Sequence, residues 1–237
     1  MQVSRRSLIG AGSTLALTAM LPARGRAADC EPPCTPDEAL DKLRKGNDYF
    51  ANNAKPRDYD MSDTRRRTIA VKQTPFAAIL CCSDSRAAPE QVFQAGLGEL
   101  FVVRNAGTTV ANPQALGSLE YAVGNVCVPL IVVLGHTRCG AAEAATGIAE
   151  TGKPLPGSLE GMVLPLVSAA VWTRTRRGSA TWTDATTIEN VFRVTDTLKD
   201  PNQPVLHPKL EDGHLKIVPA IYDLETGKVN WAPQRAS

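Results

Sequence analysis

The sequence predicts an α/β fold with a short parallel β-sheet and flanking helices. Four short, continuous apolar runs occupy residues 76–81, 100–103, 130–134 and 215–222, and such runs are typical of strands that are buried on both faces. A stretch with apolar residues at helical spacing, 112–124, lies between the second and third runs. Strands that alternate with helices along a chain are typical of a parallel sheet.

The segments outside these runs predict further elements. Residues 36–51 have the apolar spacing of an amphipathic helix, with Thr35 as its N-cap and a proline at its first position. Residues 61–72 predict a second helix, whose arginines lie on a solvated or partner-facing edge. Residues 152–161 are rich in Gly and Pro and predict a loop. The polar segment 173–187 has no clear pattern and stays unassigned.

Length and composition indicate one sizeable hydrophobic core. The chain has 237 residues, of which 43% are hydrophobic and 21% charged, which excludes a disordered or fibrous protein and is too short for three ordinary domains. We divide it into a signal peptide at 1–27, a linker at 28–35 and one α/β domain at 36–237. The formal net charge is +2, but residues 28–237 hold 22 basic and 24 acidic residues. A basic surface for nucleic acid is therefore not predicted.

The signal peptide is predicted to direct export by the twin-arginine route. Arg5 and Arg6 precede an apolar run that ends at Leu21, and Gly25 and Ala27 suit positions −3 and −1 of a peptidase site. The run, about 14 residues or roughly 21 Å as a helix, is shorter than a hydrocarbon layer of about 30 Å. We therefore expect cleavage after Ala27 or after Ala28, no lasting membrane anchor and a periplasmic location. The alternative is a basic N-terminus that stays on a cytoplasmic protein.

Two of the apolar runs end in potential metal ligands. The run 76–81 continues into Cys82, and the run 130–134 continues through Gly135 into His136 and, three residues later, Cys139. Ligands collect at the carboxyl ends of the strands in an open parallel sheet, so both segments can meet in one crevice. Two thiolates and an imidazole suit Zn²⁺, and three protein ligands leave a fourth position for water or a carboxylate.

An acidic and a basic residue follow the first ligand. Asp84 is the nearest candidate for the fourth metal position, or for accepting a hydrogen bond from bound water. Arg86 is placed to pair with Asp84, which would hold the carboxylate ionised and away from the metal. The pair could equally be an ordinary ion pair in a turn.

The cysteines can also be interpreted without a metal. Cys81 and Cys82 could be two small buried hydrophobic residues, or Cys82 or Cys139 could be a nucleophile with His136 as its base. Cys81 and Cys82 are adjacent in the sequence, and an oxidising compartment could join them in a disulfide that would destroy a metal site. Metal loading before export would avoid this oxidation.

Taken together, the ordered blocks of the sequence resemble the β-class carbonic anhydrases. Residues 82–86 and 135–141 are similar to the two ligand motifs of the family, and 98–107 and 118–123 are similar to two further blocks in the same order. Residues 222–229 resemble its terminal strand hairpin, which adds an antiparallel edge strand to the predicted sheet. Gln73, nine residues before Cys82, matches the active-site glutamine of the family.

The resemblance implies a function and a set of site residues. Zn²⁺ would be held by Cys82, His136 and Cys139 and would catalyse the reversible hydration of CO₂ to bicarbonate and a proton by a metal-bound hydroxide. Asp84 would orient this hydroxide, and Arg86 would hold Asp84. Gln73 would donate a hydrogen bond to an oxygen of CO₂ or bicarbonate.

The resemblance also implies a homo-oligomer, a homodimer or a homotetramer, in which an N-terminal helical arm wraps the partner. Two other functions stay open. The first is hydrolysis of carbon disulfide or carbonyl sulfide on the same fold, and the second is a catalytically inactive zinc-binding assembly module. The presence of Asp84, Arg86 and Gln73 argues against the second, because a structural zinc site has no use for residues that orient water.

Overall fold

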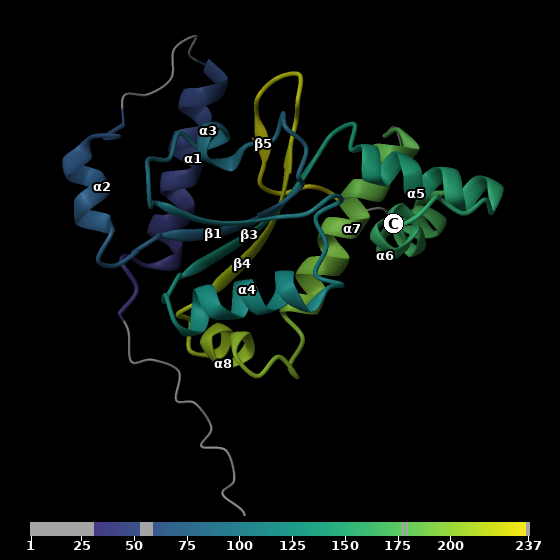
Figure 1. Ribbon diagram of the computed structural model, residues 1–237. Helices are drawn as coiled ribbons and strands as arrows, with labels where there is room; N and C mark the ends of the chain where they lie inside the picture. Colours follow the sequence, from purple (N-terminus) through teal and green to yellow (C-terminus); the bar gives the residue numbers. More distant parts are fainter. Residues whose placement is uncertain (1–30, 53–58, 177, 179, 236–237) are drawn as a thin grey trace, which may run out of the picture.

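The computed structural model describes residues 31–52, 59–176, 178 and 180–235, and its centre is one mixed β-sheet (Figure 1). The strand order is β2-β1-β3-β4-β5. The strands are β1 (Ala77–Cys81), β2 (Leu100–Arg104), β3 (Leu130–His136), β4 (Lys216–Tyr222) and β5 (Val229–Asn230). The first four run parallel, and β5 pairs antiparallel with the end of β4. The predicted α/β class, parallel core and antiparallel edge strand are confirmed.

Helices cover both faces of this sheet. Helices α1 (Pro36–Asn52) and α3 (Pro89–Val92) lie on one face, and α4 (Pro113–Gly124), α7 (Trp182–Leu198) and α8 (Leu206–Glu211) lie on the other. Successive strand side chains point to opposite faces, so Ile79 and Cys81 pack towards α1 whereas Ala78 and Leu80 pack towards α4 and α7. All five residues of β1 are buried, which explains why its sequence is continuously apolar rather than alternating.

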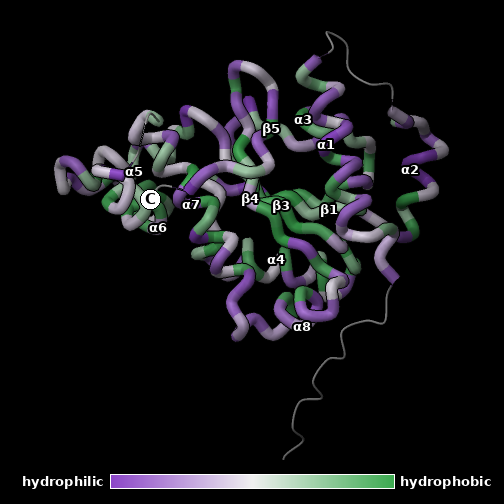
Figure 2. Tube along the Cα trace, turned by 180° about the vertical axis from the view of Figure 1, so that it is seen from behind, coloured by the Kyte–Doolittle hydropathy of each residue, from purple (hydrophilic) through white to green (hydrophobic). Residues whose placement is uncertain are grey.

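Two further helices project beyond the carboxyl ends of the strands. Helices α5 (Gly140–Thr151) and α6 (Leu159–Thr173) pack against each other at one side of the sheet (Figure 1). Their apolar residues form a third cluster that includes Cys82, Cys139 and Leu166. Hydrophobic residues are concentrated along the central strands and hydrophilic residues along the outer helices (Figure 2). The α5–α6 pair therefore forms an apolar wall beside the carboxyl ends of β1 and β3, next to Cys82 and Cys139.

The N-terminal helix starts as its sequence predicts. The backbone N–H of Thr35 donates to a Glu38 carboxylate oxygen at 2.9 Å, and the N–H of Glu38 donates to the Thr35 hydroxyl at 3.3 Å, which is a reciprocal capping box. The second predicted helix is shorter than expected, because α2 (Asp63–Ile69) ends before the chain extends into β1. Residues 1–30, which contain the predicted signal and the first three residues of the linker, lie outside the described residues.

Two segments between the ligand loop and β4 differ from their sequence interpretation. The predicted loop 152–161 ends early, because α6 already begins at Leu159. The unassigned segment 173–187 contains the end of α6 and the first turn of α7, which is capped by the Thr181 hydroxyl. Within the part of the chain that the model covers, no helix combines the length and apolar character needed to cross a bilayer.

Candidate metal centre

The sheet brings the three predicted metal ligands together. Strands β1 and β3 are parallel neighbours, with Cys81 opposite Leu134, so Cys82 and His136 both lie at the carboxyl edge of the sheet. Cys139 is the residue that precedes α5. The ligand atoms of Cys82, His136 and Cys139 all lie within 4.8 Å of one another, and all three residues are buried. This spacing suits a single ion with two thiolate ligands and one imidazole ligand.

His136 presents one nitrogen to this cluster. Its Nδ1 lies 2.9 Å from the carbonyl oxygen of Thr137, so this nitrogen carries the proton and donates to the carbonyl. Its Nε2 is buried and is the only buried side-chain nitrogen or oxygen of the described residues without a hydrogen-bond partner. A metal ion would satisfy this lone pair, and a hydrogen bond at the other ring nitrogen is the usual support for a metal-binding histidine. The residues present therefore fit Zn²⁺.

The pKa values of the Cys82 and Cys139 thiols are shifted in opposite directions. A hydrogen bond from Cys139 lowers the pKa of Cys82, and the same contact raises the pKa of Cys139. Burial alone would lower the pKa of His136, but the negative charge of the neighbouring Cys82 and the contact of Nδ1 with the Thr137 carbonyl outweigh it, and the net pKa is raised. Cysteine and histidine side chains bind a metal in their deprotonated forms, so binding of a cation at this cluster would release protons.

Cys81 has a different environment from Cys82. It is 1% exposed and belongs to the apolar cluster on the α1 face of the sheet, whereas Cys82 belongs to the cluster beside α5 and α6. Burial raises the pKa of the Cys81 thiol to about 12, so it stays protonated. Both cysteines are free thiols, and they pack in different apolar clusters.

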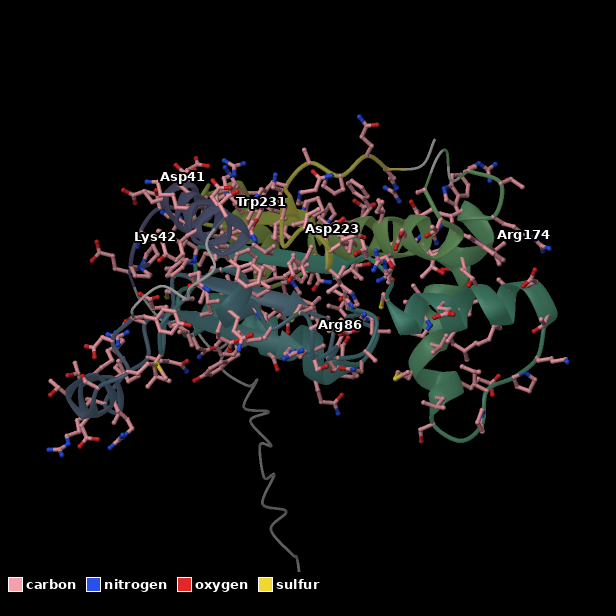
Figure 3. All side chains as sticks on the ribbon, turned by 90° about the horizontal axis from the view of Figure 1, so that it is seen from above. Asp41, Lys42, Arg86, Arg174, Asp223 and Trp231 are labelled. Atoms are coloured by element: carbon pink, nitrogen blue, oxygen red, sulfur yellow. The ribbon has the colours of Figure 1, made fainter. Side chains whose placement is uncertain are left out.

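Asp84 and Arg86 form a two-pronged ion pair beside the ligands. Arg86 Nε donates to Asp84 Oδ1 at 2.9 Å, and Arg86 Nη2 donates to Oδ2 at 2.7 Å. These bonds hold the pKa of Asp84 well below its usual range. Asp84 Oδ2 lies 3.9 Å from His136 Nε2, so an ionised carboxylate faces the space at the ligand atoms. Figure 3 shows Arg86 between the α1 residues Asp41 and Lys42 on one side and Arg174, which follows α6, on the other.

Arg104 holds the loop that carries the first ligand. It ends β2, next to the end of β1. Its Nε donates to the carbonyl oxygen of Cys82 at 3.0 Å, and its Nη2 donates to that of Asp84 at 2.7 Å. A guanidinium with several fixed donors suits such a double contact. Arg104 therefore ties β2 to the 82–84 backbone.

Helix α7 contacts the loop that carries His136 and Cys139 and also the turn at Gly107 and Thr108, which the sequence did not indicate. The Asp184 carboxylate accepts a hydrogen bond from the backbone N–H of Arg138 at 2.8 Å, and Arg138 lies between two of the ligands. Asn190 donates to the carbonyl oxygens of Gly107 and Thr108 at 2.9 and 3.1 Å. Asn190 is one of several polar residues buried on α7, so nothing in the sequence singled it out, and its two acceptors come from a distant segment.

Gln73 lies apart from the other predicted site residues in the same chain. It is exposed and precedes β1, whereas Cys82 follows β1 at the opposite end. The five residues of β1 span roughly 16 Å at about 3.3 Å each. A single chain therefore brings together Cys82, His136, Cys139, Asp84 and Arg86, but not Gln73.

Comparisons with known proteins agree on one family. A family model described as carbonic anhydrase matches residues 77–229, which include all three candidate metal ligands. Carbonic anhydrase 2 of Mycobacterium tuberculosis is 36% identical over 197 residues, which cover 83% of this chain and 93% of the relative. The carbonic anhydrase of Pseudomonas aeruginosa is 35% identical over 170 residues, which cover 69% of this chain and 76% of the relative.

Solved structures show the same fold. The structure of the β-carbonic anhydrase CcaA matches with a TM-score of 0.62 and 26% identity over 81% of this chain and 91% of that chain. A tetrameric β-carbonic anhydrase of Sordaria macrospora matches with a TM-score of 0.64 and 22% identity over 82% of this chain and 94% of that chain. The chain therefore belongs to the β-class carbonic anhydrase family.

Proposed function

We propose that this protein catalyses the reversible hydration of CO₂ to bicarbonate and a proton, with zinc held by Cys82, His136 and Cys139. The observation that carries the proposal is the unpartnered Nε2 of His136, buried with two cysteine sulfurs and 3.9 Å from Asp84 Oδ2. The names and activities of the family relatives point to the same reaction.

The residues of the chain have separate tasks in this reaction. Zinc, when bound, supplies the Lewis acidity that lets a water molecule lose a proton near neutral pH. The Asp84 carboxylate accepts a hydrogen bond from the attacking oxygen and so directs a lone pair of that oxygen towards CO₂. Arg86 keeps Asp84 ionised and turned away from direct ligation, because both carboxylate oxygens already accept its N–H groups. The apolar wall beside Cys82 and Cys139 suits an apolar substrate.

A stopped-flow assay of CO₂ hydration on zinc-loaded protein tests this proposal. We expect activity that is lost when zinc is removed and that returns when zinc is restored. Zinc-loaded, folded protein without CO₂ hydration would overturn it. Carbon disulfide and carbonyl sulfide should be offered to the same preparation, since hydrolysis of either without CO₂ hydration would favour the alternative reaction. A preparation that binds zinc but turns over none of the three would favour an assembly module.

The exposed edge of the sheet at β2 supports a homodimer in which the β2 strands of two copies pair. β2 is the terminal strand of the sheet in the described part of the chain, and its apolar residues Leu100 to Val103 are only partly buried. An exposed apolar edge strand is a template for pairing with a second strand. A two-fold axis at the middle of β2 would join two sheets antiparallel and place Leu100 of one copy beside Arg104 of the other.

In this dimer, Gln73 of one copy would lie near the metal centre of the other copy. The start of β1 lies beside the start of β2, with Ala77 opposite Leu100. The two-fold pairing brings the start of β2 in one copy to the end of β2 in the other, where Arg104 contacts Cys82 and Asp84. Gln73 of a second copy would then approach the ligands that Gln73 of the same chain does not reach. Its amide would donate to an oxygen of CO₂ or bicarbonate without adding charge.

Export to the periplasm by the twin-arginine route completes the proposal. Its support is the sequence of residues 1–27 alone, with Arg5 and Arg6 before the apolar run. Changing both arginines to lysine should retain the protein in the cytoplasm, whereas the unchanged protein recovered from the periplasm should begin after Ala27. An intact Met1 on the periplasmic protein would contradict cleavage, and equal export of the double variant would contradict the route.

A further inference from the structure

We propose that Asn190 is a positioning residue for the metal centre and acts through the turn at Gly107 and Thr108 on the sulfur of Cys82. The inference deepens the proposed function and rests on the proposed ligation of zinc by Cys82. It concerns α7, a helix that supplies none of the three candidate ligands.

The contact with the ligand is a backbone hydrogen bond. The N–H of Gly107 donates to Cys82 Sγ at 3.4 Å in a buried environment. A fixed N–H donor draws negative charge from a thiolate and sets the direction in which its remaining lone pairs point. The strength of this bond depends on how well the peptide plane at Gly107 is held.

The turn that carries this N–H has an unfavourable backbone conformation. Gly107 has φ +86° and Thr108 has φ +55°, and a threonine in the left-handed region is strained. A side chain at Gly107 is excluded as well, since its Cβ would lie 2.9 Å from Leu166 Cδ2 and 3.2 Å from Ala141 Cβ. Such a turn keeps its shape only when the surrounding structure fixes it.

Asn190 fixes the turn from the other side. Its Nδ2 donates to the Gly107 carbonyl at 2.9 Å and to the Thr108 carbonyl at 3.1 Å, so one amide group orients two successive peptide planes. Asn190 is 4% exposed, which leaves water little opportunity to replace it. The two peptide planes immediately follow the one whose N–H contacts Cys82. Loss of Asn190 would therefore leave two buried carbonyls without this donor and let the turn relax away from the sulfur.

Two variants of Asn190 separate this role from general packing. Asn190→Asp keeps the size of the side chain but replaces the donor group with an oxygen that cannot donate, and Asn190→Ser keeps one donor on a shorter side chain. Thr195→Val is the matched control, because Thr195 is also buried on α7 but its hydroxyl donates to Val191 of the same helix.

Metal release and cadmium NMR are the readouts. In zinc-loaded full-length protein, we expect a chelator to remove zinc about 10- to 100-fold faster from Asn190→Asp than from wild type, less than this from Asn190→Ser, and at the wild-type rate from Thr195→Val. In protein loaded with ¹¹³Cd, the coupling between cadmium and the Gly107 amide proton should be present in wild type and lost in Asn190→Asp. Neither readout requires catalysis, so a wild-type protein that binds metal but hydrates no CO₂ would refute the proposed function and not this one.

Either of two results would overturn the inference. The first is a folded Asn190→Asp variant with wild-type zinc release and an unchanged cadmium coupling. The second is the absence of cadmium coupling to the Gly107 amide in wild type, a measurement that decides the question even if no variant at Asn190 folds.

Discussion

Arg86 contacts Asp84 through both its side chain and its backbone. The backbone N–H of Arg86 donates to Asp84 Oδ1 at 2.9 Å, in addition to the two guanidinium bonds. A fourth hydrogen bond of Arg86, from Nη2 to the Arg138 carbonyl at 3.5 Å, links the pair to the loop that carries His136 and Cys139. The dyad is thus a fixed feature of the ligand loops, and it explains why Asp84 faces the ligand atoms while remaining paired.

Replacement of Asp84 should remove activity without removing zinc. In Asp84→Asn the side chain keeps its size but loses its charge and one acceptor, so we expect kcat/KM for CO₂ hydration to fall about 100- to 1000-fold. Zinc content per chain should stay at the wild-type level, because Asp84 is not among the three ligands. Asp63→Asn is the control, since Asp63 also pairs with two arginines but lies exposed on α2. Wild-type activity of Asp84→Asn would exclude the orienting role.

The two adjacent cysteines should respond differently to the same substitution. Cys82→Ala removes a metal ligand and should abolish stoichiometric zinc binding, measured by metal analysis after dialysis. Cys81→Ala should keep its zinc and lose only about 1 kcal/mol of unfolding free energy, because Cys81 packs on the other face of β1. If Cys81→Ala lost zinc as well, the assignment of the sulfurs to opposite faces would be wrong.

Mixing of two inactive variants tests whether Gln73 acts in a second copy. Gln73→Ala and Cys82→Ser should each be inactive alone. After the two proteins are unfolded together and refolded with zinc, about half of the dimers are mixed, and each mixed dimer has one site with both residues intact. We therefore expect about a quarter of wild-type activity. Recovery of no activity from mixed dimers, verified by differently tagged subunits, would show that Gln73 does not act across the interface.

The C-terminal segment should stabilise α7 through a buried carboxylate. Glu189 is 1% exposed and accepts hydrogen bonds from Arg193 at 2.7 Å and from Arg235 at 2.9 Å. Arg235→Ala leaves this carboxylate with one arginine, so we expect a loss of about 1–3 kcal/mol in the free energy of unfolding. Arg67→Ala is the control, because the exposed pair of Arg67 with Asp63 should contribute less than about 1 kcal/mol. Urea titrations measure both, and equal losses would contradict the prediction.

The Glu189 carboxylate should make the free energy of unfolding depend on pH. Burial would raise the pKa of Glu189, but the hydrogen bonds from Arg235 and Arg193 outweigh it, and the net pKa is lowered. A carboxyl whose pKa falls on folding stabilises the protein above the pKa of the unfolded state, about 4.3, and loses that contribution as the pH falls through the lower folded value. The stability difference between wild type and Glu189→Gln should therefore be largest near neutral pH and shrink below about pH 4. A difference that grows on acidification would reverse the assigned sign.

The strands and the ligands were predictable for related reasons. Strands buried on both faces need continuously apolar residues, and the runs before Cys82 and His136 meet this condition over their whole length. Because β1 and β3 are parallel, the residues that follow them must share one edge of the sheet. The carboxyl-edge argument therefore made Cys82, His136 and Asp84 candidates, and the family resemblance assigned their roles.

The helices after the second ligand loop were harder to predict. Helix α6 is apolar around most of its circumference and contains Pro165, so it has neither the clear stripe nor the composition of a surface helix. Helix α7 begins inside a polar segment, and its boundary depends on the Thr181 cap. In both helices, packing against neighbours outweighs local propensity.

The sequence by itself determined the class of the sheet, and through its family resemblance it predicted Cys82, His136 and Cys139 as metal ligands and the acidic and basic pair beside them. These features depend on residue type and on spacing within one segment. Only the tertiary structure decided that His136 Nε2 lacks a partner, that Cys81 and Cys82 face opposite sides, that Gln73 lies at the far end of β1 and that Asn190 supports the turn at Gly107. Each of these depends on contacts between segments distant in the chain, and such contacts are set by packing in three dimensions, which no local pattern encodes.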